Sequence, residues 1–112
     1  MATTIATVVD MGADLLDLIP GAWERSIYYD VSKLSEECGE VAEALNKSAK
    51  TVEDLAEELA DVILVCSVIA LKQGIDLNKA ILSKHPKRIS KLLKRWHGGV
   101  YPKGTTPRVA QT

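Results

Sequence analysis

The chain has 112 residues and a formal net charge of −1, and 46% of its residues are hydrophobic although only 4% are aromatic. This length, with one stretch of dense hydrophobic periodicity, leaves room for a single domain and excludes a second hydrophobic core. The apolar content, mostly Ala, Val, Leu and Ile, favours helix packing over an aromatic-rich sandwich, while the net charge argues neither for nor against a nucleic-acid partner.

The first predicted helix covers residues 3–19, where apolar residues recur with helical spacing until Pro20 and Gly21 end it. No basic region precedes these apolar residues and no cleavage-like site follows, so we expect no signal peptide. Residues 23–29 are predicted to form a connector or a short helical turn, which carries three of the five aromatic residues. We expect these three to cap the core in preference to stacking on a nucleobase: Trp23, Tyr28 and Tyr29.

A second helix is predicted to begin at Asp30 or Ser32, both suitable N-caps, and to run to about Asn46. Thr51 and Asp54 resemble a capping box and predict a third helix that runs to residue 73, before Gly74. The apolar stripe of the second helix has helical spacing: Val31, Leu34, Cys38, Val41 and Leu45. Cys38 and Cys66 both lie in apolar patterns and outside any CxxC pair, so we interpret both as reduced core residues.

A fourth helix is predicted from Asp76 or Leu77 to Trp96, with a kink or a break at Pro86. Four helices with short loops predict an all-α fold of the four-helix-bundle type. We expect a single domain over residues 1–112, with an N-terminal helical part (1–22), a helical core (30–96) and an irregular C-terminal tail (98–112).

Charge is unevenly distributed along the chain. Residues 36–61 contain nine of the fifteen acidic residues, whereas the chain from Lys72 onward contains ten Lys and Arg and one acid. Such an arrangement suits a cation site beside a polyanion site, although both segments are also compatible with ordinary solvated faces.

Two pairs of acidic residues on consecutive helices are the most informative feature. Glu37 with Glu40, and Glu58 with Asp61, are three residues apart, so each pair points from one side of its helix. If the two pairs meet, the four carboxylates need a hard divalent cation such as Mg²⁺ or Mn²⁺. Geometry alone leaves this site and a solvated acidic stripe equally favoured. Beyond Asp61 the helix is apolar almost all round, and we expect another helix or subunit to bury it on every side.

The last helix carries a basic stripe with helical spacing: Lys84, Arg88, Lys91 and Arg95. Its other side is apolar and is predicted to pack: Ile81, Leu82, Ile89, Leu92, Leu93 and Trp96. The basic stripe suits contact with a triphosphate, contact with a nucleic-acid backbone, or simple solubilisation of the helix.

The segments KLSEECGEVAEAL and DLAEELADVILV together resemble the MazG-like family of nucleotide pyrophosphohydrolases, whose pattern is EExxE, a variable gap and ExxD. The resemblance covers about residues 31–95, and GIDLNKAI is similar to the family's link into its last helix. It implies a MazG-like helical fold and a magnesium-dependent enzyme that converts nucleoside triphosphates to nucleoside monophosphates and pyrophosphate.

Carried over residue by residue, the resemblance implies magnesium ligands, with manganese as a substitute, at Glu37, Glu40, Glu58 and Asp61. Glu36 would activate or orient the attacking water. In the last helix, Lys84 matches a family lysine that contacts phosphate. The chain departs from the family where Arg88 and Lys91 stand in place of an Asn and an Arg, with Pro86 between. The substrate-binding residues would be Lys84, Arg88 and Lys91.

We expect a cytoplasmic homodimer or homotetramer that binds a nucleoside triphosphate. No membrane span is expected, because the longest apolar run, residues 62–71, is far shorter than the roughly 20 residues that a transmembrane helix requires. A nucleic-acid partner is not expected. The alternative is a non-catalytic dimeric helical module that binds nucleic acid through its basic last helix and is indifferent to Mg²⁺. Phosphoribosyl-ATP pyrophosphohydrolases have a similar acidic helix pair, but the Arg and Ser-Tyr-Thr features of their N-terminal half are not found here.

Overall fold

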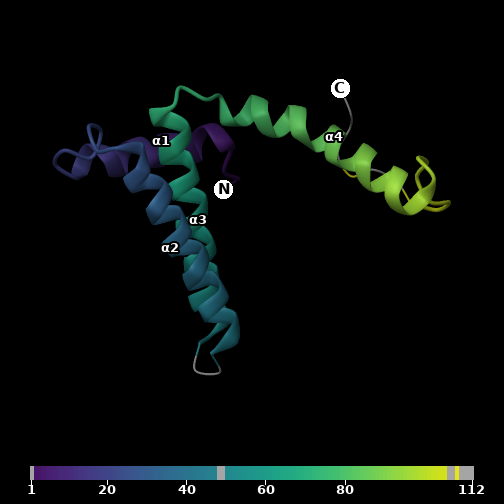
Figure 1. Ribbon diagram of the computed structural model, residues 1–112, viewed down its shortest axis with the longest axis horizontal. Coiled ribbons are helices and arrows are strands. Elements are labelled where there is room, and N and C mark those ends of the chain that lie inside the picture. Colours follow the sequence, from purple (N-terminus) through teal and green to yellow (C-terminus); the bar gives the residue numbers. More distant parts are fainter. Residues whose placement is uncertain (1, 48–49, 106–107, 109–112) are drawn as a thin grey trace. The chain divides into compact units, whose positions relative to one another are not determined.

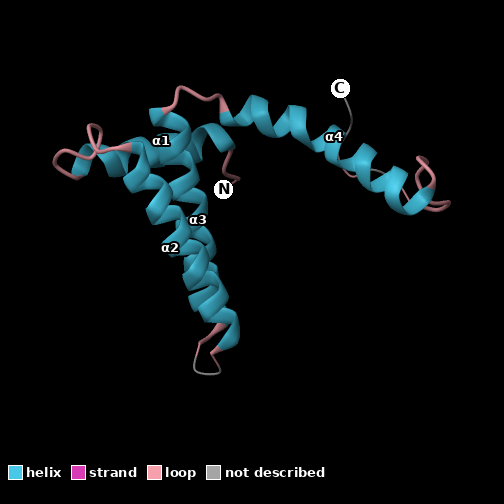
Figure 2. Ribbon diagram, in the orientation of Figure 1, coloured by secondary structure: helices cyan, strands magenta, loops and turns pink. Residues whose placement is uncertain are grey.

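The computed structural model describes residues 2–47, 50–105 and 108, which contain four helices and no strands (Figures 1 and 2). The helices are α1 (Ile5–Leu18), α2 (Ile27–Asn46), α3 (Val52–Lys72) and α4 (Leu77–His97). The predicted all-α fold is therefore confirmed. The chain forms two compact units: the first extends to Leu77 and contains α1, α2 and α3, and the second begins at Asn78 and contains most of α4.

The start of α1 and both ends of α3 follow from interactions within a few residues of the chain. Before α1, the hydroxyl of Thr4 accepts a hydrogen bond from the Thr7 amide at 3.1 Å. The predicted capping box is present at α3: the Thr51 hydroxyl accepts from the Asp54 amide at 3.2 Å, and the Asp54 carboxylate accepts from the Thr51 amide at 2.7 Å. After α3, Gly74 adopts a φ of 64°, which glycine tolerates without strain.

Helix α2 begins earlier than predicted. Ser26 is its N-cap, because the Ser26 hydroxyl accepts a hydrogen bond from the Tyr28 amide at 3.2 Å. The prediction of a cap at Asp30 or Ser32 was wrong, since Asp30 lies within α2 and its buried carboxylate is 2.7 Å from the Lys72 ammonium. The early start also places Tyr28 and Tyr29 in the first turn of α2 and not in the connector.

Of the three aromatic residues expected to cap the core, Tyr28 does not, whereas Trp23 and Tyr29 are about half exposed and make local contacts. Tyr28 is 80% exposed. Trp23 donates a hydrogen bond from its indole nitrogen to the Asp17 carboxylate at 2.7 Å. Tyr29 packs beneath the guanidinium of Arg25, which lies 4.2 Å from the ring centroid. These contacts hold the connector against α1 and the start of α2.

Helix α4 continues through Pro86, so of the two predicted alternatives the break is excluded, and a kink at Pro86 stays a prediction. Proline removes only one helical hydrogen bond, and the helical residues on both sides maintain the others. No residue of α4 is buried within the described structure, and its apolar side stays accessible at several positions: Ile81, Leu82, Leu92 and Trp96. None of the helices in the described part of the chain is long and apolar enough to cross a membrane.

The core of the first unit forms where α3 packs against both α2 and α1. Figure 1 shows α2 and α3 side by side, joined at one end by their short connection. At the crossing of α1 and α3, a Cβ atom on Gly12 would lie 2.4 Å from the hydroxyl oxygen of fully buried Ser67. Only glycine therefore permits this close approach. Among the residues that the structure describes, the buried hydrophobic ones are Leu16, Ala22, Ala44 and Ala70.

The α2–α3 pair has an apolar face that is open to solvent. Helical spacing places the following exposed residues along it: Val31, Cys38 and Leu45 of α2, and Val52, Leu59 and Ile63 of α3. Cys66 is partly buried, and this burial, followed by the nearby Cys38 thiol, raises its pKa. The expectation that Cys38 is a core residue is wrong within this chain. Within this chain the second half of α3 is not covered on every side, because Ile63 is 53% exposed, and its burial by another subunit stays a prediction.

Candidate metal centre

The four acidic residues singled out from the sequence converge between α2 and α3. Glu37 and Glu40 lie one turn apart on α2, and Glu58 and Asp61 lie one turn apart on α3. Each of the four offers one carboxylate oxygen, and these oxygens all lie within 4.8 Å of one another. We call this group the carboxylate cluster. The predicted meeting of the two pairs is therefore present in the structure.

Burial makes the carboxylate cluster unfavourable without a cation. The side chain of Glu37 is only 7% exposed, and Glu40 and Glu58 are partly buried, while Asp61 is exposed. One oxygen of Glu37 and one of Glu58 are buried with no hydrogen-bond partner in the described structure. An unsatisfied buried carboxylate oxygen is costly, and a hard divalent cation is the ligand that all-oxygen donor sets accommodate. The donor set thus fits Mg²⁺ or Mn²⁺.

The protein's own charges compensate the carboxylate cluster only in part. The pKa of Glu40 is raised chiefly by a hydrogen bond shared with the Glu58 carboxyl. Partial desolvation and repulsion by the Glu58 charge raise it further, in that order. Lys33 lies 3.3 Å from an oxygen of Glu36 and 3.3 Å from an oxygen of Glu37, and hydrogen bonds to both raise the Lys33 pKa. One lysine on the rim cannot neutralise four carboxylates.

A buried ion pair connects the other end of the same two helices. The Lys72 ammonium at the end of α3 lies 2.7 Å from the Asp30 carboxylate and donates to the Arg25 carbonyl at 3.3 Å. Arg25 approaches the second oxygen of Asp30 at 3.9 Å. Both Asp30 and Lys72 are nearly inaccessible, at 3% and 7% exposure. This contact determines how the first turn of α2 meets the last turn of α3, and so helps to align the two acidic pairs.

The remaining residues carried over from the resemblance lie outside the carboxylate cluster. Glu36 has an exposed side chain and accepts a hydrogen bond from Lys33 at 3.3 Å. In the second unit, Lys84, Arg88 and Lys91 line one hollow of about 270 Å³ on α4, together with Leu92 and Arg95. The basic stripe of α4 is therefore present as predicted, and Arg95 shares its hollow.

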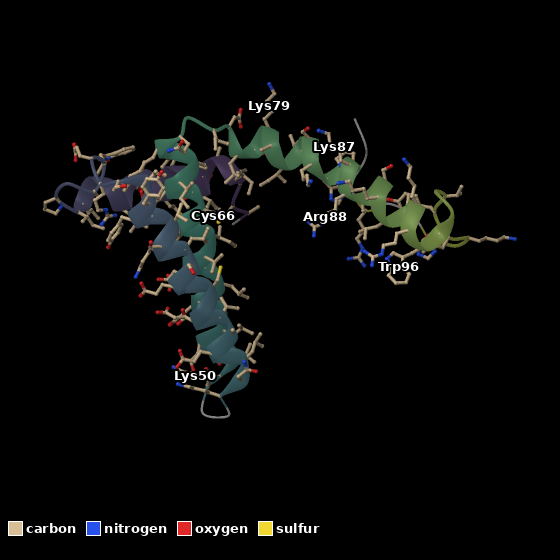
Figure 3. The ribbon with its side chains drawn as sticks, viewed as in Figure 1. Lys50, Cys66, Lys79, Lys87, Arg88 and Trp96 are labelled. Carbon is tan, nitrogen blue, oxygen red and sulfur yellow. The ribbon has the colours of Figure 1, made fainter. Side chains whose placement is uncertain are left out.

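A groove beside the carboxylate cluster was not predicted from the sequence. A groove of about 280 Å³ runs from Glu40 and Glu58 toward the connection between α2 and α3, and is lined by Glu40, Glu43, Ala44, Lys50, Asp54 and Glu58. We call it the loop groove. Figure 3 shows Lys50 on the flank of the helix pair where oxygen atoms gather, and Cys66 toward the flank where carbon predominates.

The family model described as the MazG nucleotide pyrophosphohydrolase domain matches residues 30–93, which is more than half of the chain. The matched range contains the whole carboxylate cluster and the loop groove. No curated protein and no solved structure matches the chain.

Proposed function

We propose that this chain, which belongs to the MazG nucleotide pyrophosphohydrolase domain family, hydrolyses nucleoside triphosphates to nucleoside monophosphates and pyrophosphate with the help of magnesium. The observation that carries the proposal is the carboxylate cluster, with its two buried and unpartnered oxygens. Glu37, Glu40, Glu58 and Asp61 would hold the cation, and Mn²⁺ would substitute for Mg²⁺.

The chemistry requires that a polyanionic substrate be brought to a strongly acidic site. When bound, magnesium offsets phosphate charge and makes water easier to ionise beside it. The chain's own contribution is to hold its four carboxylates on two packed helices, so that no rearrangement is needed during the reaction. Lys84, Arg88 and Lys91 are proposed to bind the phosphates, because their donors already line one hollow on α4.

Glu36 is proposed to orient the attacking water and to accept its proton. It precedes Glu37 and lies one turn before Glu40 on α2, and its carboxylate is exposed, so water can reach it. A carboxylate in that position can act as a general base. The Lys33 ammonium, which contacts both Glu36 and Glu37, would hold the Glu36 side chain in place.

A second copy of the chain is proposed to cover the apolar face, as a homodimer or as a homotetramer built from such pairs. The apolar face presents six exposed apolar residues on two adjacent helices. A contiguous apolar surface of this kind is typical of a protein–protein interface, because leaving it in water is unfavourable. Light scattering on the purified chain tests this. A Leu59→Lys/Ile63→Lys variant is expected to dissociate, whereas Leu18→Lys on α1 keeps the oligomeric mass. A wild-type monomer would contradict the proposal.

The enzymatic proposal is tested by incubating the protein with eight common ribo- and deoxyribonucleoside triphosphates, with and without Mg²⁺, and measuring pyrophosphate release. Glu40→Gln and Asp61→Asn are expected to abolish turnover while helical content is unchanged. Glu53→Gln, which removes an exposed carboxylate of α3 outside the carboxylate cluster, serves as the control and should stay active. If no triphosphate is turned over in a Mg²⁺-dependent manner, the alternative of a nucleic-acid-binding module that uses the basic α4 becomes the better interpretation.

A further inference from the structure

The loop groove begins at the carboxylate cluster and ends at the connection between α2 and α3. It shares Glu40 and Glu58 with the carboxylate cluster, so a molecule that contacts the proposed cation would extend into it. Among the residues that the structure describes, its lining contains one basic residue, Lys50, and one apolar side chain, the methyl group of Ala44. These described lining residues offer no aromatic or extended apolar surface to a nucleobase.

The two carboxylates at the outer end of the loop groove already have partners. Glu43 forms an ion pair with Lys47, which lowers the Glu43 pKa. Asp54 accepts hydrogen bonds from the Thr51 amide at 2.7 Å and the Thr51 hydroxyl at 3.0 Å, and these bonds lower its pKa. Asp54 also lies in the first turn of α3, where the helix dipole offsets negative charge. The main partner of each carboxylate is therefore a residue other than Lys50.

Lys50 itself is available to a ligand. Within residues 2–47, 50–105 and 108, its ammonium group makes no hydrogen bond and no ion pair. The side chain is exposed but lines the loop groove, close enough to Glu43 and Asp54 to contribute to lowering the pKa of each. Lys47 differs in both respects, because it is paired with Glu43 and does not line the groove.

We propose that Lys50 binds the pyrophosphate portion of the substrate in the loop groove, a role that rests on the proposed function of the carboxylate cluster. An anionic group that reaches from the proposed divalent cation to the Lys50 ammonium is attracted at both ends, and the pyrophosphate portion is the part of the substrate with this property. The nucleoside then extends away from the loop groove. Lys50 lies outside the four acidic positions and outside the basic stripe, so it is an additional binding residue.

The experiment measures binding of inorganic pyrophosphate by calorimetry in the presence of Mg²⁺, in parallel with steady-state turnover. Lys50→Gln is expected to weaken pyrophosphate binding about tenfold, since one charge-assisted hydrogen bond is lost. Lys50→Arg should retain most of the affinity. Lys87→Gln makes the same change in net charge on an exposed turn of α4 and should bind as the wild type. Binding of a nucleoside monophosphate should be the same in all four proteins.

The proposal is overturned if Lys50→Gln binds pyrophosphate as tightly as Lys87→Gln does, or if the wild type with Mg²⁺ binds none. The failure of the enzymatic proposal is distinguishable from both results. A wild type that turns over no triphosphate but binds pyrophosphate in a Lys50-dependent way contradicts the activity and supports the binding site. Active enzyme with unchanged pyrophosphate affinity in Lys50→Gln contradicts only the role of Lys50.

Discussion

Replacement of Glu37 by glutamine separates the stability of the metal-free protein from its response to magnesium. Glu37 has the most buried side chain of the carboxylate cluster, and one of its oxygens has no partner in the described structure. Glutamine has nearly the same shape, carries no charge and brings an amide donor to its carboxylate neighbours. We therefore expect Glu37→Gln to be more stable than the wild type without metal.

The magnitude follows from the burial of this group. A buried and unsatisfied polar atom costs about 1–3 kcal/mol, whereas the lost ion pair with half-exposed Lys33 is worth about 0–1 kcal/mol. The net gain without metal is thus about 1–2 kcal/mol. With Mg²⁺ at about a hundred times its dissociation constant, the wild type gains about 2.7 kcal/mol through binding. That corresponds to a rise in Tm of roughly 10 °C for a chain of this size.

The assay is unfolding by heat and by urea, followed by circular dichroism at 222 nm, with and without saturating Mg²⁺. The wild type should show the full shift and Glu37→Gln little or none, so that the order of stability reverses when metal is added. Glu53→Gln serves as the control and should respond as the wild type does. The reasoning is refuted if metal-free Glu37→Gln is less stable than the wild type, or if it retains the Mg²⁺-induced shift.

Three further predictions concern contacts within the first unit. Gly12→Ala should be less stable than Gly39→Ala by about 1–3 kcal/mol in urea unfolding. Both variants gain helix propensity, but only Gly12→Ala forces a Cβ atom against Ser67. Equal stabilities of the two variants would contradict the close crossing of α1 and α3. Replacing Asp30 alone by Leu should lower the free energy of unfolding by about 3–5 kcal/mol. The double variant Asp30→Leu/Lys72→Met should lose much less stability than the sum of the two single variants. Strictly additive effects in this double-mutant cycle would contradict the buried ion pair. Because the Asp54 pKa is lowered by folding, its contribution is present above the ordinary aspartate pKa and is lost as pH falls through the lowered value. The stability difference between wild type and Asp54→Ala should shrink over that acidic range, and a difference independent of pH would show that the capping bond does not depend on ionisation.

Features that depend on one helix at a time could be predicted from the amino-acid sequence. Thr51, Asp54 and Gly74 mark the ends of α3 through bonds and angles within a few residues of the chain, and these were predicted. The three-residue spacing within each acidic pair and the basic stripe of α4 are likewise properties of a single helix. These patterns were sufficient to indicate the family and the four members of the carboxylate cluster.

Tertiary structure alone decided how the helices meet. Asp30 looked like a helix cap, but Lys72, 42 residues away, takes its carboxylate into the interior, and α2 begins at Ser26 instead. Cys38 follows an apolar pattern yet lies on an open face, and Lys50 lines a groove that exists only once α2 and α3 are paired. Periodicity reports which residues share a side of one helix. It contains no information on which side another helix will cover, because that depends on contacts between residues distant in the chain, such as Gly12 with Ser67.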